Sequence, residues 1–184
     1  MHLELSDILK ACRRNDVKAQ RWLFDHYYRQ MLNVCIRYVK DEADAEDMLS
    51  QGFTKVFKNL DRFTYEHEYG LRVWIKTIMI HECLMFLRKR NNFLLVPISE
   101  AGEVGSSDLR LDEMDAAYIF QQIATLPVGY RTVFNLYVVE GYSHAEIATL
   151  LQIKEATSRS QLNKARELLK TKLSTYKISQ YGKR

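Results

Sequence analysis

Proline and glycine are scarce in this sequence, with 2 and 7 copies among 184 residues. Turn-rich β architectures use both residues at their many loops, so this scarcity argues against them and favours long helices. No apolar run approaches the roughly 18–20 residues that span a bilayer. The first residues also lack the basic and then apolar segments of a secretory signal. We therefore predict a helical protein of the cytoplasm that does not insert into a membrane.

Cysteine is also rare, with only Cys12, Cys35 and Cys83, which lie far apart among apolar neighbours. No Cys/His pair has the spacing of zinc ligands, so a metal site is not expected. Free cysteine behaves as a small core residue, and buried, reduced thiols are the simplest interpretation. Nothing in the sequence supports the alternative, a redox sensor.

Catalytic motifs are missing as well. The sequence has no glycine-rich phosphate loop, no nucleophile elbow and no His-Glu-x-x-His pattern. A carboxylate cluster could be imagined as a metal site, but most of its members fall at a helix start, where negative charge suits the helix dipole. The cluster comprises Asp41, Glu42, Asp44, Glu46 and Asp47. We predict no catalytic residue, no metal and no cofactor.

What the sequence does contain is helical periodicity. Residues 1–92 have apolar stripes at i, i+3, i+4 spacing, which predict four helices joined by short connections and packed as one small bundle. The first helix has Ser6 as its expected cap. The four predicted helices cover residues 6–14, 17–40, 44–60 and 71–90.

Residues 93–113 differ from what precedes them. They contain one Pro, two Gly and three Ser, have no helical period, and carry five acidic residues against one basic. This composition predicts a flexible acidic linker between two domains. The fold class is therefore all-α, with two small helical domains.

Residues 114–184 return to helical patterns. Helices are expected over 114–125 and 130–139, the second ended by Gly141. Ser143 and Glu146 then have the spacing of a capping box. A short helix to Leu151, a tight turn and a long helix to about Ser174 complete a helix-turn-helix. Its expected core residues are Ile147, Leu150, Leu151, Leu162, Ala165 and Leu169.

The outer face of the long helix presents residue types that read base edges or hold phosphates. They are Arg159, Ser160, Asn163, Lys164 and Glu167. Residues 152–184 carry nine basic against two acidic residues, which favours a polyanion partner. The alternative is a plain helical bundle with a solvated polar face.

Three segments together resemble extracytoplasmic-function sigma factors of bacterial RNA polymerase. The segments are DEADAEDMLSQGFTKVFKNLDRF, GLRVWIKTIMIHECLMFLRKRNN and LPVGYRTVFNLYVVEGYSHAEIATLLQIKEATSRSQLNKARELLKTKL. The first two are similar to region 2 of that family and the third to region 4. Residues 1–92 would then be region 2, and residues 114–184 region 4. The linker would be a solvated tether or a mimic of nucleic acid in a polymerase channel.

The resemblance implies a set of site residues. Those that match the surface for the β′ clamp helices of core polymerase are Asp47, Ser50, Gln51 and Phe53. Those that match the capture of flipped minus-10 bases are Phe63, Tyr65, His67, Trp74, Lys76 and His81, although Trp74 is open to a second interpretation as a core residue. Those that match the minus-35 recognition helix are Arg159, Ser160, Asn163 and Lys164.

Some positions depart from the family pattern. Ser50-Gln51 stands where the family often has Gln followed by an acidic residue, and His81 where a base-contacting Asn is usual. Gln152 occupies a turn position that is often Gly. Ser158 replaces a β-branched apolar residue and Gln161 an Arg. We interpret these departures as altered specificity.

The resemblance implies three partners: core RNA polymerase through its β′ clamp helices and β subunit, promoter DNA, and an anti-sigma factor. One rival function is a self-sufficient helix-turn-helix repressor or activator, which would bind a palindromic operator as a dimer without polymerase. Another is an interaction module that sequesters other regulators and binds neither DNA nor core polymerase.

Overall fold

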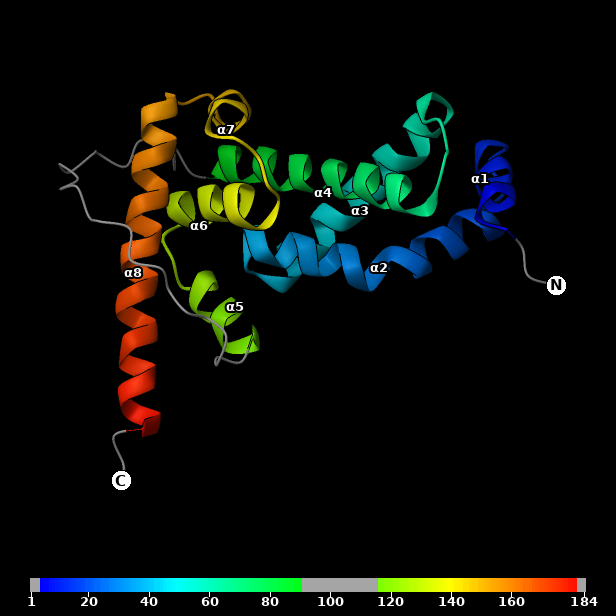
Figure 1. Ribbon diagram of the computed structural model, residues 1–184. Coiled ribbons are helices and arrows are strands. Elements are labelled where there is room, and N and C mark those ends of the chain that lie inside the picture. Colours follow the sequence, from blue (N-terminus) through cyan, green and yellow to red (C-terminus); the bar gives the residue numbers. More distant parts are fainter. Residues whose placement is uncertain (1–3, 91–115, 182–184) are drawn as a thin grey trace. The chain divides into compact units, whose positions relative to one another are not determined.

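The computed structural model describes residues 4–90 and 116–181, and every element in these ranges is a helix (Figure 1). The chain divides into two compact units, Met1–Arg90 and Asn91–Arg184. The predicted all-α class with two helical domains is confirmed. The predicted linker, 93–113, lies outside the described residues, so the domain boundaries at 92 and 114 stay predictions.

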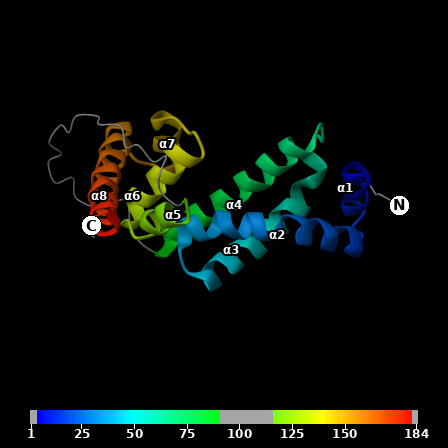
Figure 2. The same ribbon diagram turned by 60° about the horizontal axis from the view of Figure 1, so that its bottom comes forward.

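In the N-terminal unit, three long helices pack together and a short one lies at their end. The long helices are α2 (Val17–Val39), α3 (Glu42–Asn59) and α4 (Glu68–Arg90). The short helix α1 (Leu5–Arg13) contacts α2 and the 3-10 turn η1 (Leu60–Arg62). Figures 1 and 2 both place α1 beside the end of the bundle where α3 passes into α4.

Polar caps define where the long helices begin. The side chain of Asp16 accepts hydrogen bonds from the amides of Lys18 and Ala19 at the start of α2. Asp41 caps α3 in the same way. The predicted Ser6 cap is wrong, because α1 already begins at Leu5 and its N-cap, Glu4, makes no side-chain cap bond.

The interior of this unit is closely packed and apolar. Phe24 and Phe53 meet with ring centroids 4.8 Å apart. A Cβ placed on Gly52 would come within 2.3 Å of the Met79 sulfur, so α3 and α4 approach closely there. Two ion pairs join α3 and α4: Lys55 Nζ lies 2.6 Å from Glu82 Oε1, and Arg90 pairs with Asp44.

The three cysteines lie inside this unit, and all three are buried, as expected, with free thiols. Burial is the main cause that raises the pKa of the Cys12 thiol to about 11. A hydrogen bond with Cys35, together with burial, raises the pKa of Cys83. Since the thiolate is the reactive form, Cys12 and Cys83 are poor nucleophiles in the folded protein.

In the C-terminal unit, three short helices contact one side of a long one (Figure 1). They are α5 (Ala116–Ala124), α6 (Val128–Phe134) and α7 (His144–Leu151), and the long helix is α8 (Glu155–Tyr181). The predicted core positions are confirmed, with Leu150 half-buried and the other five fully buried. Helix α8 extends beyond the predicted end at Ser174.

The segment after α6 differs from the prediction of one α-helix over 130–139. Residues Asn135–Val139 (η3) form a π-helical turn, and the amide of Glu140 donates to the carbonyl of Asn135, five residues earlier. Gly141 then has a positive φ of 83°, a conformation that glycine adopts at little cost.

No helix in the described ranges is both long enough and apolar enough to cross a membrane. Within 4–90 and 116–181, His, Cys, Asp and Glu side chains also form no group of three that could hold a metal ion.

Candidate nucleic-acid interface

The turn between α7 and α8 fixes the start of the long helix. Gln152, at the turn position that is often Gly in the family, adopts the left-handed conformation, with φ 56° and ψ 44°. A residue with a Cβ costs roughly 1–2 kcal/mol in this conformation compared with glycine. Its amide donates to carbonyls of α7, so the turn closes in the normal manner of a helix end.

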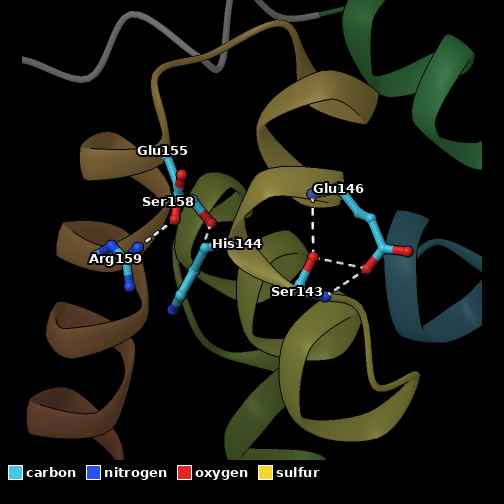
Figure 3. Close-up of polar contacts among 6 residues, drawn as sticks. All are labelled: Ser143, His144, Glu146, Glu155, Ser158 and Arg159. Carbon is cyan, nitrogen blue, oxygen red and sulfur yellow. Dashed lines mark hydrogen bonds and ion pairs between the residues drawn. The ribbon is translucent and has the colours of Figure 1, made fainter.

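The start of α7 carries the predicted capping box (Figure 3). The Ser143 hydroxyl accepts from the Glu146 amide at 3.3 Å, and the Ser143 amide donates to Glu146 Oε2 at 2.8 Å. The hydroxyl and amide of Ser143 both lower the pKa of the Glu146 carboxyl, because they stabilise its charged form. The two residues together satisfy amide groups at the start of α7 and fix where the helix begins.

The candidate minus-35 residues lie on the first turns of α8. Arg159 and Asn163 are exposed at i, i+4 spacing and therefore share a face, while Ser160 and Lys164 are half-buried beside them. Arg159 pairs with Glu155 (Figure 3). Lys164 Nζ lies 3.2 Å from Glu167 Oε2. Both ion pairs join residues of the same helix, at i, i+4 and i, i+3 spacing.

One contact in this unit was not predicted. His144 Nδ1 lies 2.9 Å from the hydroxyl of Ser158, which is fully buried, and this hydrogen bond joins the first turn of α7 to the first turn of α8 (Figure 3). The imidazole also stacks on Tyr137, with centroids 4.4 Å apart. Burial, and next the charge of Arg159, lower the pKa of His144. The departure at Ser158 thus has a structural role.

The candidate minus-10 residues lie partly on helix α4 and partly on the loop before it, residues 63–67, which we call the minus-10 loop. In the loop, Phe63 and Tyr65 are half-buried and His67 is exposed. The ring of Phe63 stacks on Trp74 of α4, with centroids 4.6 Å apart and planes 24° from parallel. His67 Nδ1 accepts from the Gly70 amide at 2.9 Å and so caps α4. Both contacts join the loop to α4.

Helix α4 does not bring all of its predicted residues together. Trp74 and His81 are seven residues apart and lie on one side of the helix, Trp74 half-buried and His81 exposed. Lys76 follows Trp74 by two residues and lies on a different side. Trp74 therefore supports the loop through Phe63, which favours its interpretation as a packing residue with a partly exposed ring.

The candidate polymerase surface lies on α3. Asp47, Ser50 and Gln51 are exposed and share one face through their i, i+3, i+4 spacing. Phe53 is only 2% exposed and packs on Phe24, so its ring lies inside the bundle beneath that surface. Phe53 therefore supports the surface and does not form part of it.

A cavity of about 490 Å³ also opens between α1 and the loop, next to the candidate minus-10 residues. Sequence periodicity gave no sign of it, because its walls come from segments about fifty residues apart. It is lined by Ser6, Leu9, Lys10, Arg13, Asp61, Phe63, Thr64 and Tyr65.

Comparison with protein families gives two matches, in the same order as the two helical units. Residues 23–93 match Sigma-70 region 2, and residues 116–169 match Sigma-70 region 4. Together these ranges include every candidate site residue named above.

Two curated relatives match along most of their length. The chain is 26% identical to the RNA polymerase sigma-H factor of Pseudomonas aeruginosa, with 88% of this chain and 90% of that protein covered. It is 25% identical to the extracytoplasmic-function sigma factor SigW of Bacillus subtilis, with 94% and 98% covered.

A solved structure has a similar fold. The sigma factor RpoE of Bartonella quintana, crystallised with the anti-sigma factor NepR, superposes with a TM-score of 0.51 at 19% identity. The superposition covers 84% of this chain and 96% of that one.

Proposed function

We propose that the two helical units carry out different parts of promoter recognition, since the chain belongs to the extracytoplasmic-function group of the sigma-70 family. The protein is an alternative sigma factor that directs transcription. Residues 1–92 act as region 2, residues 93–113 as the linker and residues 114–184 as region 4. The observation that carries this division is the match of the two Sigma-70 regions to two separate helical units in sequence order.

In the C-terminal unit, Arg159, Ser160, Asn163 and Lys164 read the minus-35 element. The exposed face of Arg159 and Asn163 has the chemistry for base edges, since guanidinium and amide groups form paired hydrogen bonds with purines. Lys164 is placed for a phosphate. The helix-turn-helix core beneath them fixes the angle at which α8 enters the major groove.

In the N-terminal unit, the aromatic loop and α4 receive the unpaired minus-10 strand. Phe63, Tyr65 and His67 offer rings for stacking, and His81 offers a polar edge. Trp74 holds Phe63 by stacking, and Lys76 attracts the backbone from another side of α4. Because His81 stands where an Asn is usual, we expect a base preference that differs from well-known family members.

The exposed α3 residues Asp47, Ser50 and Gln51 bind the β′ clamp helices of core polymerase, supported from inside by Phe53. Region 4 also contacts the β subunit. The family is not known for enzymes, and we propose that polymerisation belongs entirely to the core enzyme. The protein then works where the polymerase is, in the cytoplasm. RpoE of Bartonella quintana was solved with an anti-sigma factor, and we propose that an inhibitor of that class also controls this chain.

The test of the proposed function is reconstitution with core RNA polymerase, followed by run-off transcription on genomic fragments. We expect co-purification with core and new start sites that core alone does not use. Binding of a palindromic duplex by a dimer, without any affinity for core, would replace this proposal with the repressor-or-activator function.

A pair of asparagine variants tests the minus-35 assignment. Asn163→Ala removes an exposed amide from α8, and a lost base contact of this kind costs about 1–3 kcal/mol and relaxes the preference at one position. Asn33→Ala removes an exposed amide from α2 and serves as the control. Run-off from promoters with each base at each minus-35 position should change for the first variant only.

A further inference from the structure

We infer that Arg13 on α1 is a positioning residue for the minus-10 loop, an inference that rests on the function proposed for that loop. The guanidinium group of Arg13 spans the start of the loop. One terminal nitrogen donates to the carbonyl of Phe63 at 2.7 Å, and Nε donates to the carbonyl of Leu60 at 3.3 Å. Arg13 is half-buried at this contact.

The two carbonyls lie at the two ends of the 3-10 turn that leads from α3 into the loop. Leu60 begins η1, and Phe63 is the first residue after it, with extended backbone. Within the turn, the Phe63 amide donates to the Leu60 carbonyl at 3.2 Å, so Arg13 joins a junction that is already closed on itself. A planar guanidinium with donors in a fixed fork suits two neighbouring acceptors better than a flexible ammonium does.

Phe63 is thereby held from two directions. Arg13 fixes its backbone from α1, while Trp74 fixes its ring from α4 at 4.6 Å. With its backbone and its ring both fixed, Phe63 sets the direction in which the chain continues to Thr64 and Tyr65. Thr64 and Tyr65 line the same cavity as Arg13, so α1 determines the shape of the loop on that side.

The neighbouring residue Arg14 provides a matched comparison. It carries the same charge one position later, at the C-cap of α1, but it is exposed. A general contribution of positive charge to DNA binding would come from Arg14 as much as from Arg13. A positioning role belongs to Arg13 alone.

The experiment uses holoenzyme reconstituted from core polymerase and the full chain, on a promoter library with a fixed minus-35 element and a randomised minus-10 element. The variants are Arg13→Gln, Arg13→Lys and, as the control, Arg14→Gln. For Arg13→Gln we expect the preference for the best minus-10 base to fall about tenfold, the scale of one lost hydrogen bond from a charged donor. Core affinity and minus-35 preference should not change. Arg13→Lys should lie between Arg13→Gln and the wild type, and Arg14→Gln should match the wild type.

Two results would overturn the inference. One is an unchanged minus-10 preference in Arg13→Gln, or in Arg13→Lys if the first variant does not fold. The other is an equal loss of core binding, minus-35 preference and minus-10 preference, which marks a general structural role. If the wild-type holoenzyme itself starts no promoter-specific transcripts, the proposed function fails before any variant is considered, and the inference fails with it.

Discussion

The two helical units are stabilised by different kinds of interior. Among the described residues, the N-terminal unit buries a large apolar core and one charged side chain, Glu82. The C-terminal unit has a smaller apolar cluster around Ile123, Leu126, Ala165 and Leu169. It also buries five polar or charged residues, namely Arg131, Thr132, Asn135, Ser158 and Gln161.

This difference matches what each unit must hold in place. Apolar packing is not directional, and in the N-terminal bundle it supports the candidate polymerase surface on α3 and the loop before α4. Hydrogen bonds are directional, so a polar interior fixes how one helix is oriented against another. Arg131 shows this, because its guanidinium donates to the carbonyls of Ala124 and Leu126 and ties α6 to the end of α5.

Breaking the Lys55–Glu82 ion pair in the N-terminal unit should have the largest effect on stability. Lys55→Met leaves the buried carboxylate of Glu82 without its cation, and such losses cost about 3–5 kcal/mol. We expect the lower end, because the Lys55 side chain is 44% exposed. The two tryptophans, Trp22 and Trp74, both lie in this unit, so tryptophan fluorescence in urea reports its unfolding alone.

Lys58→Met on the exposed side of α3 is the control and should be close to neutral. Replacing both partners, with Lys55→Met and Glu82→Met together, should restore most of the lost stability, since no buried charge then remains. A double variant as unstable as Lys55→Met would show that the N-terminal unit depends on more than packing.

The next effect concerns the hydrogen bond between the two helices of the helix-turn-helix. Ser158→Ala leaves His144 Nδ1 half-buried without its hydroxyl, and we expect a loss of about 1–2 kcal/mol in the C-terminal unit. Hydrogen exchange of the α7 and α8 amides measures it without interference from the other unit. Ser174→Ala, an exposed serine on the same helix, should change nothing. Equal protection in both variants would contradict the role given to this bond.

A smaller effect, of opposite sign, is expected at Gln161. Its Oε1 atom is buried and has no hydrogen-bond partner among the described residues. Gln161→Met keeps a similar shape and removes that oxygen, so the C-terminal unit should gain about 1 kcal/mol. Exchange of the α8 amides should slow accordingly, while Gln121→Met on the exposed side of α5 should leave it unchanged. Faster exchange in Gln161→Met would mean that the amide contributes to the polar interior.

The smallest effect is a pH dependence confined to the polar unit. The pKa of His144 is lowered from 6.5 by burial and by Arg159, with a smaller opposing effect of Glu155 and a further lowering by Arg166. The unfolded chain therefore binds this proton more readily, and the C-terminal unit should lose stability as pH falls from about 6.5 through the lowered value. Exchange of α7 amides at pH 7.5 and 5.5, corrected for intrinsic rates, measures the change. His144→Gln should remove the difference, and an undiminished one in that variant would point to another group.

The sequence predicted those parts of both units that depend on local pattern. The helical stripes and the Ser143–Glu146 capping box both follow from spacing within a few residues, and the structure confirms them. That Arg159 and Asn163 share a face of α8 was predictable for the same reason, since i, i+4 positions share a side of a helix.

Contacts between distant segments left no such signal. Arg13 meets carbonyls 47 and 50 residues away, and main-chain acceptors have no residue type that a sequence could reveal. The hydrogen bond between His144 and Ser158 joins two helices across a turn. Serine is a polar residue, so the residue type at Ser158 does not indicate its burial. Phe53 lies on the apolar stripe of its helix, which predicts its burial, whereas the matched motif assigned it to the polymerase surface.

The π-helical turn at Asn135–Val139 has a consequence for the evolution of the C-terminal unit. A π turn contains one residue more than the α turn it replaces, so it is the form that a single-residue insertion takes inside a helix. The extra residue is accommodated locally, and the positions on either side keep their partners. Relatives that lack one residue in this segment would therefore have a regular α-helix here and the same helix-turn-helix after it. Val138 and Val139 are exposed on this turn, and we therefore expect the deletion of one residue here to leave the following helix-turn-helix intact.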